Sequence, residues 1–480
     1  MDVSTAIKKQ NCFMGGKYVF TKWKIGMVTS LLAFTAFTSV ISAEEKPKDQ
    51  PKWEEWIKEN AQKLNEPNAQ TNEDLSFLKE KIKDKRIVLL GESTHGAKEI
   101  NQSKVRMIKY LHEEMGYDVI AFETGFAEAN AVNQNLDQLT ALQAMKKSLY
   151  GVWHTEEILE LFQYIKDQKE KGTPLILTGF DTQFRWYSYF PEFAKEWLEK
   201  INPEIANDIE IAHKELLNIE EKIESIDNKY PYEQYKADVQ QVIAKYEKIK
   251  TFVQQHKAEL NKIAPSNTYD VNLLEKTISI RIDTIKTLQD ATVKEKNFIY
   301  PTNFKLTDLS LYIRDQKMGQ SLAWLSDIQY KNKKIIVWGH NYHIRKQNSK
   351  MILDLFKFQQ NNLKAPNMID YLPQRIKDQM YTIGVYAYSG NSWDSSDLNK
   401  IVPIDTDHAE QSIENILRTS QNPNVFVNLK GESNRPETSW MFTPTTARHW
   451  GVKKSEEILR PIEQYDGILW LDRISPSQYK

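Results

Sequence analysis

Short, continuous apolar runs recur along the chain, and each ends abruptly at glycine or just before a charged residue. The four clearest are residues 86–91 (RIVLLG), 118–122 (DVIAF), 174–179 (PLILTG) and 334–339 (KIIVWG). Continuous rather than alternating hydrophobicity indicates strands buried on both faces, as in a parallel sheet. Residues 97–115 and 156–170, which lie between these runs, have amphipathic helical patterns. The sequence therefore predicts an α/β fold with a mostly parallel central sheet flanked by helices.

The pattern changes between residue 191 and about residue 325, where long Lys- and Glu-rich helical stretches are interrupted by prolines. This segment is predicted to be a large helical insertion. Charged helices of this kind are usually a solvated support, and a lid over the substrate is the less favoured alternative. The sheet is predicted to resume at Lys334, and apolar runs at residues 380–386, 424–429 and 467–471 predict further strands.

The N-terminal segment is predicted to lie outside this fold. Lysines at positions 17, 22 and 24 precede residues 25–43 (IGMVTSLLAFTAFTSVISA), an uncharged run that ends in small residues. This arrangement is typical of a cleavable bacterial export signal, and an uncleaved membrane anchor is the alternative. We expect residues 1–43 to be a signal peptide and residues 44–480 to form one large domain. The protein is then expected to be secreted or associated with the cell envelope.

Composition and charge narrow the range of partners. The 64 basic and 65 acidic residues give a formal net charge of -1, so there is no overall electrostatic reason to expect a nucleic-acid partner. The one cysteine, Cys12, lies in the predicted signal peptide, which excludes cysteine catalysis and disulfides in the mature chain. No other run is apolar enough to span a membrane, so we expect no membrane partner after signal cleavage. The sequence does not indicate an oligomeric state.

Ionisable side chains follow each of the four clearest strands. In an open parallel sheet the ligand site lies beyond the carboxyl ends of the strands. The residues expected there are Glu92, His95 and Glu99 after the first strand, Glu123 after the second, Asp181 after the third, and His340 and His343 after the fourth. One acidic residue after a strand is usually a helix cap or a surface residue. The convergence of several carboxylates with three imidazoles favours a catalytic site.

His95 is the strongest candidate for a general base. It lies between Glu92 and Glu99 in a turn that enters a helix, so one carboxylate can orient the imidazole while the other ring nitrogen accepts a proton. The alternative is a structural histidine with a local hydrogen bond. His340 and His343 are predicted to share one loop, where one stabilises an oxyanion and the other orients it, or where His340 is only structural.

Several familiar catalytic signatures are missing from the sequence. G-x-S-x-G and H-E-x-x-H do not occur, and neither do the G-x-x-x-x-G-K-[ST] and G-x-G-x-x-G nucleotide motifs. Their absence counts against a serine-elbow hydrolase, a metalloprotease of that type and a nucleotide-dependent enzyme. Water activated by a histidine, with no cofactor and no metal, is the simplest remaining chemistry.

Five separated blocks resemble the erythromycin esterase family in their order and spacing. They are GESTHGAKE at 91–99, GYDVIAFETG at 116–125, GFD at 179–181, RDQKMGQSLAWL at 314–325 and WGHNYHIRK at 338–346. The resemblance extends from about Asp74 to the C-terminus. It implies hydrolysis of an ester, which is a macrolide lactone for the namesakes of the family, by water without a required metal. It also implies that His95 is the base, that Glu92 and Glu123 are active-site carboxylates, and that His340 and His343 form the second imidazole pair.

One position departs from the family pattern. The family usually has arginine nine residues after the base histidine, and this chain has Lys104 there, with Arg106 two residues later. Lysine cannot make the planar bidentate contact of a guanidinium group, so substrate recognition is expected to differ. Glu99 matches the acidic position four residues after the base. We expect Lys104, Arg106, Glu99 and Asp181 to contact the substrate.

The leading hypothesis is therefore an exported hydrolase that cleaves an ester or a lactone through His95, in a role linked to antibiotic response. Two alternatives remain open. The first is a metal-dependent hydrolase or peptidase with Glu92, His95 and His340 as ligands. The second is a non-catalytic protein that binds a ligand in the same cleft, for which aromatic residues are plentiful.

Overall fold

The computed structural model describes residues 48–184, 188–225, 230–264, 270–301, 303, 305–352, 365–395, 397–452 and 455–480. The predicted signal peptide lies outside these residues. Within the described part of the chain, no helix is both long enough and apolar enough to cross a membrane.

The centre of the fold is a parallel sheet whose strands coincide with the four clearest apolar runs. These strands are β2 (Ile87–Leu90), β3 (Tyr117–Gly125), β4 (Ile176–Asp181) and β5 (Lys334–Trp338). They lie in the order β2-β5-β3-β4, and all three pairings are parallel. The carboxyl ends of the four strands therefore lie at one edge of the sheet, as the sequence predicted.

The three later apolar runs also form strands, and they extend the sheet beyond β2. These strands are β6 (Met380–Asp394), β8 (Asn424–Asn428) and β11 (Gly467–Ile474). β6 is parallel to β2 and to β11, whereas β8 is antiparallel to β11. The sheet is thus mixed but mostly parallel, and the predicted α/β class is confirmed.

Four shorter or more exposed strands were not predicted. β1 (Gln62–Lys63) pairs with β8, and β7 (Asp397–Ile404) pairs with β6, both antiparallel. β9 (Thr445–Arg448) and β10 (Glu456–Leu459) form a separate antiparallel pair near the C-terminus. The segment between these two strands contacts the candidate site through His449 and Trp450.

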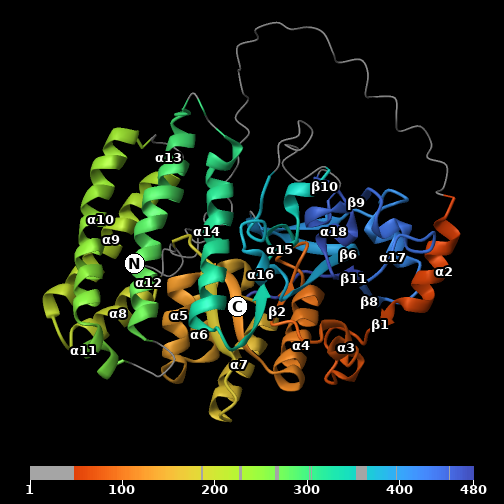
Figure 1. Ribbon diagram of the computed structural model, residues 1–480, viewed down its shortest axis with the longest axis horizontal. Coiled ribbons are helices and arrows are strands. Elements are labelled where there is room, and N and C mark those ends of the chain that lie inside the picture. Colours follow the sequence, from red (N-terminus) through yellow and green to blue (C-terminus); the bar gives the residue numbers. More distant parts are fainter. Residues whose placement is uncertain are drawn as a thin grey trace, which may run out of the picture.

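Helices flank the sheet, and several follow directly from the sequence pattern (Figure 1). α4 (Lys98–Met115) follows β2 and ends at Gly116, whose φ of 68° suits glycine at a helix C-terminus. The other helices before β4 are α2 (Gln50–Asn60), α3 (Leu78–Ile82), α5 (Phe126–Gln134), α6 (Ala141–Ser148) and α7 (Glu156–Glu170). The short helices after β5 are α15 (Asn341–Ile344), α16 (Gln374–Lys377), α17 (Ile413–Arg418) and α18 (Pro461–Gln464).

The chain between β4 and β5 is helical, as expected for the insertion. Its helices are α8 (Phe190–Leu198), α9 (Pro203–Glu224), α10 (Tyr232–Gln255), α11 (Lys257–Lys262), α12 (Val271–Thr284), α13 (Asp290–Lys296) and α14 (Ser310–Trp324). Most of them gather on one side of the sheet, and α14 lies nearest to its strands (Figure 1). α14 therefore joins the helical part to the sheet.

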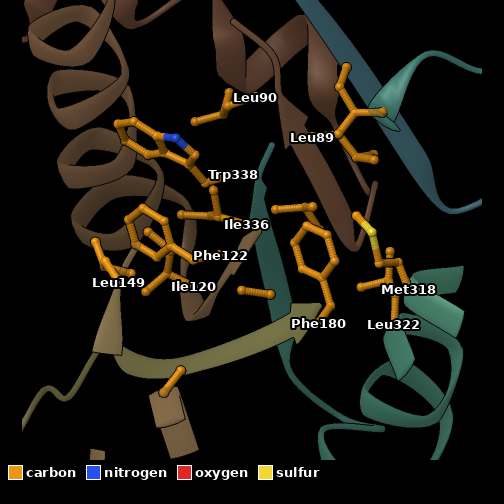
Figure 2. Close-up of a cluster of buried hydrophobic side chains, with 14 of the residues drawn as sticks. Leu89, Leu90, Ile120, Phe122, Leu149, Phe180, Met318, Leu322, Ile336 and Trp338 are labelled. Carbon is orange, nitrogen blue, oxygen red and sulfur yellow. The ribbon is translucent and has the colours of Figure 1, made fainter. Parts of the chain in front are cut away.

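The buried strands have apolar side chains on both faces of the sheet (Figure 2). On one face, Phe122 stacks on Trp338 with ring centroids 5.0 Å apart. On the other face, Phe180 lies beside Met318 and Leu322 of α14 (Figure 2). Burial on both faces explains why these strands are continuously apolar in sequence.

Candidate active site

The turn after β2 is fitted closely against the end of β5. A Cβ atom on Gly91 would lie 2.1 Å from Asn341 Oδ1 and 2.9 Å from the carbonyl oxygen of Ile383, so only glycine fits there. The Asn341 backbone N–H donates to the carbonyl of Glu92 at 2.9 Å. This contact fixes the β2 turn, which carries Glu92 and His95, beside the segment that carries His340 and His343.

Glu92 and His95 form a buried dyad in this turn. Glu92 Oε1 lies 2.5 Å from His95 Nδ1 and also accepts a hydrogen bond from Trp153 Nε1 at 3.2 Å. Because the carboxylate accepts, Nδ1 carries the proton in the neutral ring and Nε2 has the lone pair. Among the described residues, His95 Nε2 has no hydrogen-bond partner. The dyad thus has the arrangement of an oriented general base.

Lys104 binds the other oxygen of Glu92. Its Nζ lies 2.7 Å from Glu92 Oε2 and 3.7 Å from the ring centroid of Trp338. Both Lys104 and Glu92 are fully buried. Burial lowers the pKa of Lys104 to about 8, against the opposing effect of the Glu92 charge. The structure thus places Lys104 against the carboxylate that orients His95 and away from solvent.

A second ionic cluster lies at the ends of β3 and β5 and centres on Glu123 and His343. His343 Nε2 is 3.2 Å from Glu123 Oε1, and His343 Nδ1 is 2.9 Å from Asp315 Oδ1. Burial alone would lower the pKa of His343, but Asp315 and Glu123 raise it to about 10. Burial would raise the pKa of Glu123, but His343 and Arg314 lower it below its usual range. His343 is therefore an imidazolium ion at neutral pH, with both N–H groups bound to carboxylates.

Arg314 of α14 connects this cluster to β4. Its Nη2 donates to Asp181 Oδ2 at 2.7 Å and to Glu123 Oε1 at 3.1 Å. Asp181 also accepts from the hydroxyl of Tyr150 and from the backbone N–H of Thr182. Arg314 Nη1 lies 3.4 Å from His343 Nε2, and since both are cationic donors this contact is not a hydrogen bond. The carboxylates of Glu123, Asp181 and Asp315 hold the two cations together.

His340 links the two clusters through backbone groups. Its own N–H donates to Glu123 Oε2 at 2.8 Å, and its Nε2 lies 3.2 Å from the Ser93 carbonyl oxygen. Its Nδ1 accepts from the Tyr342 N–H at 3.2 Å, which caps α15. Burial, together with the neighbouring imidazoles, lowers the pKa of His340 well below its usual value. His340 is thus neutral with both ring nitrogens bonded, which leaves it with a positioning role.

Aromatic rings surround the His95 imidazole. The ring centroids of Trp153, His340 and Trp450 lie 5.0, 5.2 and 5.2 Å from that of His95. All three arrangements are edge-on, with interplanar angles of 67° to 75°. These rings limit the orientations of the imidazole.

The remaining two predicted residues bond elsewhere. Arg106 pairs with Asp74 at 2.6 Å and donates to the carbonyls of Glu66 and Thr71. Glu99 accepts hydrogen bonds from the backbone and the hydroxyl of Ser475, both at 2.6 Å. Among the described residues, neither side chain is hydrogen-bonded to the two clusters. Of the nine predicted site residues, Arg106 and Glu99 are therefore held by other segments. The structure brings the other seven together: Glu92, His95, Lys104, Glu123, Asp181, His340 and His343.

No group of three or more His, Cys, Asp or Glu side chains is arranged to hold a metal ion in the described part of the chain. Two of the three donors in the metal hypothesis, Glu92 and His340, have other partners here. His340 uses both ring nitrogens, and Glu92 is bound to His95, Lys104 and Trp153.

The sequence interpretation did not single out Arg314, Asp315, Trp153, His449 or Trp450. Arg314 and Asp315 do open the fourth block of family resemblance, which was the available signal. Trp153 follows α6, and Trp450 follows β9, in segments with no distinctive pattern. Their proximity to His95 depends on tertiary packing.

Comparison with known proteins supports the fold described above. The family model for erythromycin esterase matches residues 112–474. The chain belongs to the erythromycin esterase family. It is 44% identical over 463 residues to a Bacillus subtilis (strain 168) protein named "Putative hydrolase YbfO", covering 96% of this chain and 99% of the relative. The hydrolase assignment therefore holds at the level of the family.

Two more distant relatives carry the family name. An Escherichia coli protein named erythromycin esterase type II is 26% identical over 354 residues, which cover 71% of this chain and 78% of that protein. A solved structure of a mutant of the erythromycin esterase EreC in its open conformation superposes with a TM-score of 0.57 at 18% identity, covering 87% of this chain and 98% of that chain. This structural likeness shows that the fold is shared within the family.

Proposed function

We propose that this family member hydrolyses an ester or a lactone by general-base activation of water at His95. The observation that carries the proposal is the buried Glu92–His95 contact of 2.5 Å, which leaves Nε2 without a hydrogen-bond partner among the described residues. A carboxylate in this position fixes the tautomer in which Nε2 accepts a proton.

The proposed reaction requires neither a metal ion nor a cofactor. His95 Nε2 removes a proton from water as the water oxygen attacks the carbonyl carbon, and the carbonyl oxygen becomes negative. Collapse of the tetrahedral intermediate breaks the bond to the alkoxy oxygen. That oxygen takes the proton back from His95, so the base is regenerated.

The second cluster supplies the cationic hydrogen-bond donor of the site, although its three carboxylates outnumber its two cations. Arg314 and the protonated His343 lie around Glu123, which is bonded to the backbone of His340. We assign the hydrogen bond to the developing oxyanion to Arg314 Nη1, the guanidinium nitrogen that has no carboxylate partner among the described residues. His340 has a positioning role, and Lys104 holds Glu92.

The family membership supports a choice of two substrate classes to test. Macrolide lactones are the first class to test, and a role in antibiotic response is part of the proposal. Esters of the cell envelope or of exopolysaccharides are the second class, because the protein is proposed to be exported. Both classes offer a carbonyl to the same activated water.

The test is incubation of the purified protein with macrolide lactones and with simple esters, followed by mass spectrometry for the addition of one water. We expect a product in the presence of a chelator, and about 10²- to 10⁴-fold less product with His95→Gln. His256→Gln is the matched control, because His256 lies at the end of α10 and bonds only to a carbonyl of that helix. Wild-type turnover by His95→Gln would contradict the mechanism, and turnover that the chelator abolishes would favour a metal.

We further propose that residues 1–43 direct export. The support is the lysine-flanked apolar run that ends in small residues. Expression in a Bacillus host, followed by N-terminal sequencing of the protein in the medium and in the envelope fraction, tests this. A mature N-terminus at Glu44 is expected, and retention in the cytoplasm with Met1 intact would contradict export.

A further inference from the structure

Trp450 has a backbone conformation that is unusual for a bulky residue. It lies between β9 and β10 with φ 58° and ψ 8°, in the left-handed region that favours glycine. A non-glycine residue is held there only when its surroundings over-determine it, and such residues cluster at functional sites. The contacts of Trp450 should therefore explain why this conformation is kept.

Hydrophobic burial does not explain this conformation. Trp440, which lies ten residues earlier in the chain, is fully buried, whereas Trp450 is only partly buried. An indole that keeps solvent contact gains less from the hydrophobic effect than a buried one. The specific contacts made by Trp450 therefore also contribute to holding it.

Those contacts are with the turn that carries the proposed base. The Trp450 N–H donates to the carbonyl oxygen of Ser93 at 2.9 Å. The same oxygen lies 3.2 Å from His340 Nε2. Ser93 lies between Glu92 and His95, so two donors from distant parts of the chain hold the peptide that separates the dyad.

The indole adds a second restraint. Its centroid lies 5.2 Å from that of His95 and 4.5 Å from that of His340. His449, which precedes it, lies 4.3 Å from the His340 ring. The β9–β10 segment thus contacts the base and the histidine that holds the base turn.

This segment is itself fixed by buried charge. Glu457 of β10 lies 3.4 Å from His449 Nδ1 and accepts from Arg345 at 2.8 Å. Burial would raise the pKa of Glu457, but Arg345 and His449 lower it to about 2. The carboxylate is therefore charged under ordinary conditions and ties the segment to the chain that follows α15.

We propose that Trp450 is a positioning residue of the hydrolytic site, whose N–H and indole hold the Ser93 to His95 turn so that His95 Nδ1 stays on Glu92. This inference rests on the proposed function, since it assigns a role at the same base. Without the indole, the imidazole gains freedom to rotate away from Glu92. Misplacement of a reacting group by about 1 Å costs on the order of 10²-fold in rate.

The test compares Trp450→Gly with Trp450→Phe. Glycine keeps the N–H and relieves the backbone strain, whereas phenylalanine keeps an aromatic ring. We expect Trp450→Gly to lose about 10- to 100-fold in kcat with a small change in KM, and Trp450→Phe to restore most of the loss. Gln421→Gly is the matched control, because Gln421 has a φ of 59° on a different segment, and we expect a higher Tm with unchanged kcat.

A second readout separates positioning from mere stability. The Nδ1 proton of His95, bound to Glu92, gives a low-field NMR signal that is assigned by its loss in His95→Gln. We expect the signal in the wild type and in Trp450→Phe, and its loss or broadening in folded Trp450→Gly. If Trp450→Gly does not fold, Trp450→Leu replaces it with the same expectation.

The outcomes distinguish this inference from the proposed function. Wild-type kcat together with an intact Nδ1 signal in the folded variant would overturn the role of Trp450. A wild type that hydrolyses no ester, while its Nδ1 signal still depends on Trp450, would overturn the function and retain the positioning role.

Discussion

The ammonium group of Lys104 lies 2.7 Å from Glu92 Oε2, and neither side chain is exposed to solvent. The other oxygen of the same carboxylate holds His95. Lys104 thus neutralises the acid that orients the proposed base. At this position, where the family usually has arginine, lysine supplies one point charge.

Removing this cation leaves a buried carboxylate uncompensated. We expect Lys104→Met to lower the free energy of unfolding by about 3–5 kcal/mol, as measured by urea denaturation. Lys109→Met is the control on the same helix, because Lys109 pairs with Glu160 at the surface, and we expect a loss below about 1 kcal/mol. Equal losses in the free energy of unfolding for the two variants would show that the Lys104–Glu92 contact stabilises the fold no more than a surface ion pair does.

The pH dependence of activity should report on Lys104. Its pKa of about 8 implies that it loses its proton above that pH, which leaves Glu92 without a cation. We expect kcat/KM to fall above about pH 8 in the wild type. In Lys104→Arg the guanidinium stays charged, so the fall should move to higher pH. If kcat/KM falls at the same pH in both proteins, the titrating group is not Lys104.

His343 should make stability depend on pH in the alkaline range. Its pKa is about 10 in the folded protein against 6.5 ordinarily, so its contribution is complete below about pH 6.5 and is lost as pH rises toward 10. We expect His343→Asn to be about 3–5 kcal/mol less stable than the wild type at pH 6, and the difference to shrink by pH 10. Denaturant unfolding at both pH values measures it. A difference that does not change with pH would contradict the charged state.

The Gly91 contact predicts a steric effect on the site. A Cβ at Gly91 would lie 2.1 Å from Asn341 Oδ1, so Gly91→Ala must displace Asn341. We expect a loss of about 1–3 kcal/mol in unfolding free energy, together with reduced kcat. Gly151→Ala is the control, because its Cβ would meet only Leu398 at 3.8 Å, and we expect a change within about 0.5 kcal/mol. Equal effects at the two glycines would mean that the β2 turn is not tightly fitted.

The sequence predicted those parts of the molecule that depend on local pattern. The buried strands β2 to β5 are continuously apolar, so their positions could be predicted directly from the sequence. The positions of the strand ends in turn predicted the site residues Glu92, Glu123, Asp181 and His340. β7 was missed because only Ile404 among its residues is buried, and its apolar stretch at 401–404 (IVPI) is short and contains a proline. Arg314 and Asp315 were not singled out because charged residues on a helix are usually solvated. Only the docking of α14 on the sheet brings them to Glu123, Asp181 and His343.

Arg314 belongs to the last helix of the segment between β4 and β5, yet its partners Asp181 and Glu123 belong to the sheet. This has a consequence for exchanging parts between relatives. A chimaera that takes α8 to α13 from another family member keeps these ionic contacts intact. A chimaera that also replaces α14 must supply the same arginine and aspartate, or Asp181 is left as a buried carboxylate without its cation and His343 loses its Asp315 partner. A crossover between α13 and α14 therefore keeps the Arg314 contacts, but the incoming segment must also retain Arg281 of α12, which pairs with the buried Glu128 of α5 at 3.1 Å.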